Sequence, residues 1–223
     1  MGIVKQKSDG KGSLKDIQQV INNFPEILNT QIKKGISSLK QDEIEWLSPL
    51  KENDYCEYSD IDFINLLELN LVHPLESFWP KRGPQWDALG KSNKGDVFLV
   101  EAKANIPEIV SSPTGAGQAS KIIIDKSLIE TKLFLNSKNN VDWSGKFYQY
   151  TNRLAHLYFL RVLNNIPAWL VNVYFLNDKS VHGPKSVEEW QGAIKVMKTY
   201  LGVGNHKLSK YMIDVFIDVN DLK

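Results

Sequence analysis

The sequence predicts an α/β domain in which α-helices flank a mixed central β-sheet. Stretches with apolar residues at helical spacing alternate along the chain with short apolar runs bounded by turn residues. Helices come first, then three neighbouring strands, then helices, a strand, a helix and a last strand, and this order is typical of an α/β domain. A composition of 42% hydrophobic and 24% charged residues excludes a disordered or fibrous chain.

The helices are predicted from apolar residues that recur every three or four positions. The first begins at Ser13, which with Asp16 three residues later forms a capping-box pattern, and Pro25 breaks it. The predicted helices cover residues 13–28, 36–47, 61–71, 119–135, 146–163 and 187–200.

The strands are predicted from short runs rich in β-branched and aromatic residues. Loop-forming stretches at residues 81–84 and 91–96 separate the first three, which are expected to form a meander. The predicted strands cover residues 75–80, 85–90, 97–104, 168–176 and 212–219.

Length, charge and cysteine content place limits on organisation and setting. The 223 residues are expected to form a single domain over residues 13–223, preceded by a loose polar tail over residues 1–12. The net charge of +1 provides no global attraction for polyanions, so any nucleic-acid binding must be local. A single cysteine, no signal-peptide pattern and no apolar run of membrane-spanning length predict a cytoplasmic protein with no membrane partner.

Charged residues interrupt one face of the predicted strand 97–104. Because side chains alternate across a strand, Glu101 and Lys103 share a face with Val97 and Leu99. Ionised groups at the end of a buried strand are costly unless they are paired or coordinated. This pair therefore marks a candidate site.

A hairpin joining residues 85–90 to 97–104 about a centre near Lys94 places Asp87 opposite Glu101. Two carboxylates about 5 Å apart at an effective dielectric of about 20 repel by about 3 kcal/mol. A divalent cation reverses the sign of this interaction, and Mg²⁺ or Mn²⁺ bound by one or two carboxylates suits such a site. Lys103 could then hold the attacking water or stabilise charge on a phosphate. The alternative is an ordinary salt bridge from Lys103 to Glu101 or Asp87.

Asp87 followed by Glu101-Ala102-Lys103 resembles the Asp…(Asp/Glu)-x-Lys signature of the PD-(D/E)XK nuclease superfamily, although Trp86 stands where many members have Pro. Residues 78–90, 98–104, 148–161 and 168–176 resemble a bacterial branch of it, and the resemblance spans a core of about residues 61–177. The resemblance implies a restriction-endonuclease-like fold. It also implies Asp87 and Glu101 as metal ligands, Lys103 as the catalytic lysine and Glu68 as an earlier catalytic acid on a helix.

Three further residues are candidates for substrate binding. Gln149 and Arg153 lie on one face of the predicted helix 146–163, and Arg153 could clamp a phosphate. Some superfamily members carry Gln-x-x-x-Tyr there, and Arg153 occupies the Tyr position. Arg82 lies in a basic turn between Trp79 and Trp86 and could contact a nucleic-acid backbone. The alternatives are a solvated helix face and a simple turn.

These expectations combine into a Mg²⁺-dependent or Mn²⁺-dependent nuclease that hydrolyses phosphodiester bonds of DNA. The first alternative is a catalytically silent nuclease-fold module that binds nucleic acid or a protein partner. A second alternative is a hydrolase of another phosphorylated substrate. The oligomeric state is left open, a homodimer included.

Overall fold

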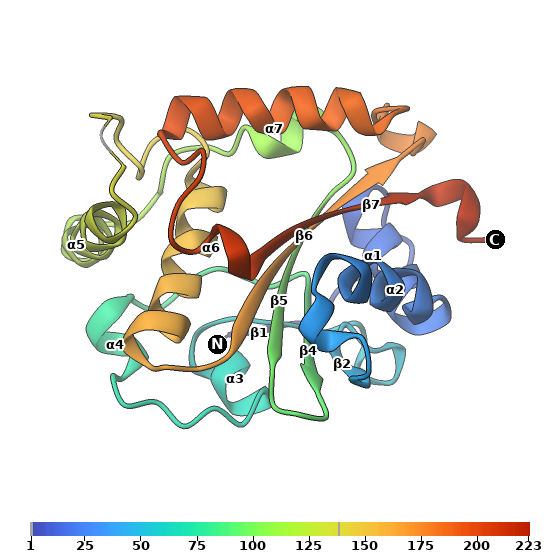
Figure 1. Cartoon of the computed structure of the whole chain (residues 1–223), viewed down its shortest axis with the longest axis horizontal. Helices are drawn as coiled ribbons and strands as arrows, with labels where there is room; N and C mark the ends of the chain where they lie inside the picture. Colours follow the sequence, from blue (N-terminus) through green and yellow to red (C-terminus); the bar gives the residue numbers. More distant parts are fainter. Residues whose placement is uncertain (1, 138) are drawn as a thin grey trace.

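The computed structural model describes residues 2–137 and 139–223, and these form an α/β domain built on a mixed sheet (Figure 1). Within the described residues the main sheet has five strands in the order β2-β4-β5-β6-β7. Its strands are β2 (Ile44–Ser48), β4 (Ala88–Ser92), β5 (Val97–Lys103), β6 (Ala168–Leu176) and β7 (Met212–Asp218). The pairings β2–β4 and β4–β5 are antiparallel, whereas β5–β6 and β6–β7 are parallel. The predicted fold class, a mixed sheet flanked by helices, is confirmed.

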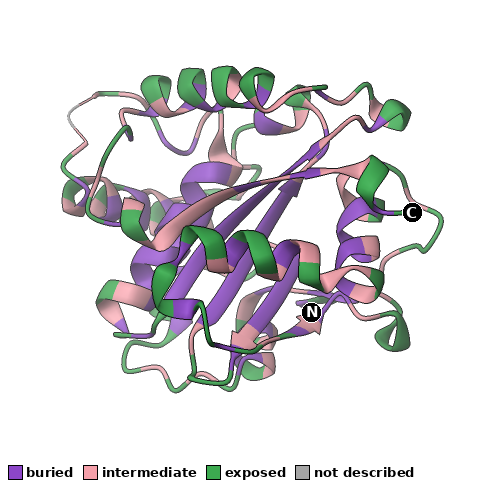
Figure 2. Cartoon of the chain, turned by 45° about the vertical axis from the view of Figure 1, so that its right-hand side comes forward, coloured by how far each residue is buried: buried purple, intermediate pink, exposed green. Residues whose placement is uncertain are grey.

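Helices cover both faces of this sheet, and two apolar clusters hold the layers together. Over the described ranges the α-helices are α1 (Ser13–Asn23), α2 (Pro25–Gly35), α3 (Asp60–Leu66), α4 (Leu75–Phe78), α5 (Gln118–Phe134), α6 (Tyr148–Tyr158) and α7 (Val187–Leu201). On β5, Phe98 and Val100 pack toward α1 and α2, whereas Val97 and Leu99 pack toward the cluster that includes α6 and α7. The central strands are buried along most of their length (Figure 2).

The periodic second half of the chain agrees closely with prediction. Strand β6 has the predicted bounds, α7 and β7 differ from them by one residue at one end, and α5 differs by one residue at each end. The predicted helix 146–163 is α6 followed by a π-helical turn over Phe159–Leu163. In each of these elements the apolar pattern is long, and apolar residues of the pattern pack against the rest of the domain.

Two elements predicted in the first half are wrong. Residues 75–80, predicted as a strand, contain the short helix α4, whose Leu75 and Phe78 are buried in the core. Residues 36–47, predicted as a helix, end in strand β2, because Trp46 turns its side chain into the core while Glu45 faces solvent. β2 therefore takes the sheet position beside β4.

The N-terminal segment is ordered where a loose tail was predicted. β1 (Ile3–Val4) pairs antiparallel with β3 (Glu57–Tyr58), and the backbone N–H of Gly2 donates to Asp62 at 2.9 Å. Backbone pairing with a distant strand fixes this segment although its side chains are largely exposed. The predicted capping box is also absent, because Asp16 is buried and Gly12 is the N-cap of α1.

Among residues 2–137 and 139–223, none of the helices has the length and apolar character needed to cross a membrane.

Candidate active site

The ladder between β4 and β5 sets the position of Asp87. Ala88 pairs with Val100 and Leu89 with Leu99, so the predicted hairpin register is confirmed. Asp87 precedes the first ladder residue; its backbone N–H donates to the carbonyl of Val100 at 3.2 Å. Its Oδ2 accepts a hydrogen bond of 2.6 Å from the backbone N–H of Ala102. The side chain of Asp87 therefore lies against β5, beside Glu101.

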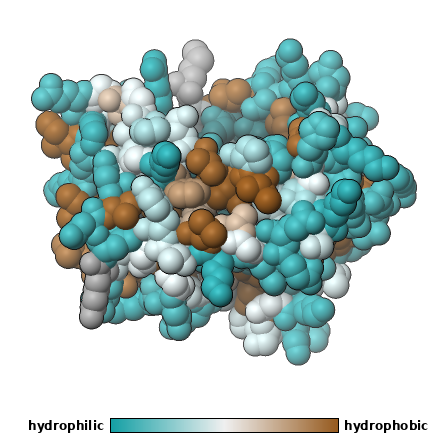
Figure 3. Space-filling model, turned by 90° about the horizontal axis from the view of Figure 1, so that it is seen from above, coloured by the Kyte–Doolittle hydropathy of each residue, from teal (hydrophilic) through white to brown (hydrophobic). Residues whose placement is uncertain are grey.

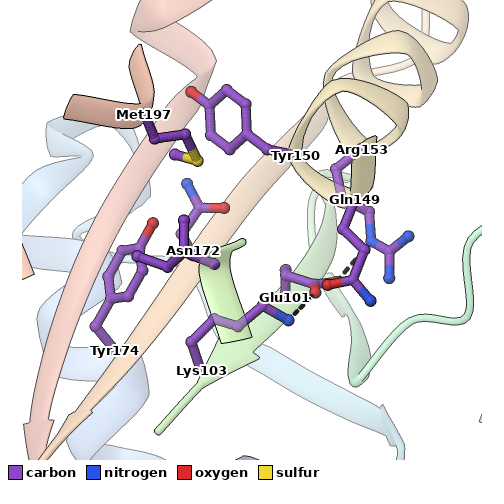
Figure 4. Close-up of a pocket in the computed structure, with 9 residues that line it drawn as sticks. Glu101, Lys103, Gln149, Tyr150, Arg153, Asn172, Tyr174 and Met197 are labelled. Carbon is purple, nitrogen blue, oxygen red and sulfur yellow. Dashed lines mark hydrogen bonds and ion pairs between the residues drawn. The ribbon is translucent and has the colours of Figure 1, made fainter. Parts of the chain in front are cut away.

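Glu101 and Lys103 lie on the face of β5 that points toward α6, as the alternation predicted. The side chain of Glu101 is buried, and its two oxygens have different cationic partners. Oε2 accepts a 2.6 Å hydrogen bond from Nε of Arg153, and Oε1 accepts one from Nζ of Lys103 (Figure 4). The Glu101–Lys103 salt bridge weighed as an alternative from the sequence is thus present, within a larger ion-pair network.

Arg153 extends from α6 to Glu101, and its remaining guanidinium nitrogens and its planar face also have partners. Nη1 donates to Oδ1 of Asn152 at 2.8 Å, and Nη2 donates to the backbone carbonyl of Gln85 at 2.6 Å. The guanidinium lies over the ring of Trp86, 5.0 Å from its centroid. Arg153 is 5% exposed, so this part of α6 is not a solvated face.

A third acid, Glu57, joins this cluster and was missed by the sequence reasoning. It lies on β3, it is 5% exposed, and its Oε2 accepts a 2.8 Å hydrogen bond from Nε2 of Gln6. Burial and the charge of Asp87 raise its pKa well above that of an ordinary glutamate. The local signal was weak, because β3 has only two residues and approaches Asp87 through the bridge between Tyr58 and Trp86, which lie far apart in sequence.

The cluster carries one more negative than positive charge when all groups are ionised: Glu57, Asp87 and Glu101 against Lys103 and Arg153. Burial, and then the charge of Glu101, raise the pKa of Asp87. For Glu101 burial acts in the same direction, but Arg153 and Lys103 outweigh it and hold the pKa below its ordinary value. Glu101 and Asp87 likewise overcome the effect of burial on Lys103 and raise its pKa, so Lys103 is an ammonium ion.

The donor set fits a divalent cation through two carboxylates. Within the described part of the chain, no group of three or more His, Cys, Asp or Glu side chains is arranged to hold a metal ion. Mg²⁺, however, is usually held by one or two protein carboxylates, and water and substrate phosphate complete its coordination shell. Asp87 and Glu101 supply such a pair, and a divalent cation would offset the repulsion between them when both are ionised.

The network borders an open cavity of about 660 Å³. Its walls include Lys103, Arg153, Gln149 and Arg82, together with Ser111 and Ser112 from the loop before α5. Gln149 is half-buried and lies beside Glu101 in Figure 4, whereas Arg82 is exposed at the rim. Lys103, Arg153, Gln149 and Arg82 therefore converge on this cavity. Asp87 and Glu101 do not line it and adjoin it through their contacts with Ala102, Lys103 and Arg153.

Glu68 is the exception, and its predicted place in the site is not supported. It follows α3, its side chain is 81% exposed, and its Oε2 forms an ion pair with Nζ of Lys91 at 2.9 Å. Lys91 pairs with Val97, four residues before Glu101 on β5, which corresponds to about 13 Å along a strand. Helix α3 ends too early to direct Glu68 toward Asp87.

His156, on the same helix as Gln149 and Arg153, is a core residue. Burial lowers its pKa to about 3, so the ring is neutral. Its Nδ1 is hydrogen-bonded to the backbone carbonyl of Asn152 at 2.8 Å, and its ring packs edge-on against Trp79 at 4.8 Å between centroids.

No protein-family model, no curated protein and no solved structure matches this chain.

Proposed function

We propose that this chain is a metal-dependent nuclease of the PD-(D/E)XK type that hydrolyses phosphodiester bonds of DNA. The observation that supports this most strongly is the convergence of Asp87, Glu101 and Lys103. The antiparallel register and the alternation along β5 bring these residues, spread over seventeen positions, to one end of a buried strand. The cavity beside them is open enough to admit a phosphate group.

In this proposal Asp87 and Glu101 hold Mg²⁺ or Mn²⁺, and Glu57 replaces Glu68 as the nearby third acid. When bound, the metal activates water and neutralises charge on the phosphate. Each carboxylate is held in place by a hydrogen bond: Asp87 accepts from the backbone N–H of Ala102, and Glu101 accepts from Nε of Arg153. Such anchoring preserves the geometry that catalysis requires.

Lys103 acts as an ammonium ion. Its raised pKa makes it a poor base, so its role is to donate hydrogen bonds to the phosphate and to the water that attacks it. Glu57 is not one of the two proposed metal ligands, and its pKa, raised to about 8, lets it exchange a proton near neutral pH.

DNA would enter through the open cavity. Arg82 at the rim and Gln149 on the wall are the side chains that we assign to its backbone and bases. Since the net charge is only +1, binding would depend on these local contacts and weaken as the salt concentration rises.

Cleavage of supercoiled plasmid, single-stranded DNA, RNA and small phosphodiesters in Mg²⁺ or Mn²⁺ tests the proposal. The expected result is metal-dependent DNA cleavage that falls by at least about a hundredfold in Asp87→Asn and in Lys103→Ala. Glu68→Gln, which changes an exposed acid outside the cluster, is the matched control and should retain activity. Equal cleavage by the wild type and both site variants would rule the mechanism out.

A catalytically silent nuclease-fold module is the second candidate, and one observation favours it. Both oxygens of Glu101 are occupied by Lys103 and Arg153, which closes the ion-pair network without a metal. Calorimetric titration with Mn²⁺ separates the two candidates. A nuclease takes up Mn²⁺ in a manner that Asp87→Asn abolishes, whereas a silent module takes up none at these carboxylates.

A further inference from the structure

Helix α5 carries an apolar stripe that nothing in the described structure covers. Ile122, Ile129 and Leu133 are 65%, 58% and 75% exposed. With Ala119 and Lys126, also exposed, they follow the alternating spacing of three and four residues that defines a coiled-coil seam. Figure 3 shows brown, hydrophobic atoms along its left-hand edge, the side on which Figure 1 places α5.

The opposite face of α5 is fully used by the domain. Ile124, Ser127, Leu128 and Thr131 are buried, and Ser127 donates to the backbone carbonyl of Phe78. The exposed stripe is therefore a second apolar face on a helix that is already anchored. The helix is 17 residues long, about 25 Å, which is enough for several layers of packing against another helix.

Charges beside the stripe select both the partner and its direction. In an antiparallel pair of α5 helices, Ile122 packs against Leu133 of the second copy and Lys126 against Ile129 of the second copy. This register places Asp125 opposite Lys132 of the second copy, and the two-fold axis repeats the attraction. Within one chain Asp125 pairs with Lys121 and Lys132 donates to the carbonyl of Val141, so the contact between copies adds to these bonds through the remaining lone pairs and N–H groups. The long apolar stem of Lys126 covers its neighbour while the ammonium reaches solvent.

A parallel pair is disfavoured by the same residues. It would stack Lys126 on Lys126 of the second copy in the seam, and it would place Asp125 near Glu130 of the second copy. Both contacts bring like charges together. The stripe is thus complementary to itself in one orientation only.

We propose that α5 is a homodimer interface in which two copies of this chain pair their α5 helices antiparallel through Ile122, Ile129 and Leu133. The inference does not depend on the nuclease proposal, because it concerns a different surface of the domain. The experiment below measures association alone and needs no catalytic activity.

Sedimentation equilibrium measures the association directly. The wild type should form a dimer at concentrations up to about 100 μM. Ile129→Glu should raise the dissociation constant of the dimer by at least about a hundredfold, because each of the two copies places one charged side chain in the interface. Val196→Glu is the matched control, because Val196 is 67% exposed on α7 and outside the seam. A monomeric wild type, or a dimer that Ile129→Glu leaves unchanged, would overturn the proposal.

Disulfide trapping tests the direction of pairing. The only cysteine of the chain, Cys56, is buried, so any disulfide that forms between copies comes from the introduced cysteines. Ile122→Cys combined with Leu133→Cys should give a covalent dimer on oxidation; within one helix these positions are about 16 Å apart and cannot bridge. Ile122→Cys alone should stay uncrosslinked. Efficient crosslinking by that single variant would indicate a parallel pair and contradict the proposed interface.

Discussion

Asp16→Asn should stabilise the protein at alkaline pH, because Asp16 is a buried carboxyl with no cationic partner in the described structure. It is 5% exposed on α1, and one of its oxygens has no hydrogen-bond partner among the described residues. Burial, followed by the charge and hydrogen bond of Asp178, raises the pKa of Asp16 to about 7 from an ordinary value of 3.8. Asparagine has the same shape, stays neutral and retains a hydrogen-bond donor for Asp178.

The sign and size follow from the two pKa values. Between pH 3.8 and about pH 7 the folded protein binds a proton that the unfolded chain has lost, so stability falls as pH rises through this window and levels off above it. Each pH unit in the window is worth about 1.4 kcal/mol. The advantage of the Asn variant should grow from about 2 kcal/mol at pH 5 to about 4 kcal/mol at pH 8.

Urea denaturation followed by tryptophan fluorescence at pH 5, 6, 7 and 8 measures this difference. Asp9→Asn, which removes an exposed acid ahead of the same helix, is the control and should change stability little at any of these values. A difference between wild type and Asp16→Asn that does not grow with pH, or an Asn variant that is less stable at pH 8, would refute the reasoning.

Two further variants test the ion-pair network. Arg153→Met should lower the free energy of unfolding by about 3–5 kcal/mol, because Glu101 then keeps only one cationic partner. Adding Glu101→Gln should recover part of this loss. If urea denaturation shows that the losses of the two single variants simply add, the two residues do not form a direct pair. Glu57→Gln should raise stability at pH 8, since it removes a buried charge beside Asp87, and it should lower cleavage at least about tenfold. Unchanged cleavage would show that Glu57 has no part in catalysis.

The sequence was most informative where a local rule and the tertiary fold agree. The hairpin between β4 and β5 has a short turn with Gly95 at a positive φ of 89°, so the register followed from counting residues about its centre. That register brought Asp87 to Glu101, and alternation along β5 placed Lys103 beside them. The apolar runs of β6 and α7 were long enough to leave little ambiguity.

The sequence was least informative where tertiary contacts decide. The aromatic-rich sequence of residues 75–80 predicts a strand. Leu75–Phe78 instead form the single helical turn α4, and the buried ring of Phe78 stacks on the ring of Phe159 with 5.0 Å between centroids. Glu68 looked suitable because it lies within the predicted helix 61–71, but α3 ends two residues before it. Glu57 could not be identified without knowing that its neighbour Tyr58 bridges to Trp86, the residue before Asp87.

Crystals of the wild type soaked in Mn²⁺ would test the central claim most directly, by anomalous scattering. The account predicts an anomalous peak within coordination distance of the carboxylates of both Asp87 and Glu101, and no such peak in Asp87→Asn. A wild-type crystal with Mn²⁺ bound elsewhere, in which Glu101 still bridges Arg153 and Lys103, would contradict it.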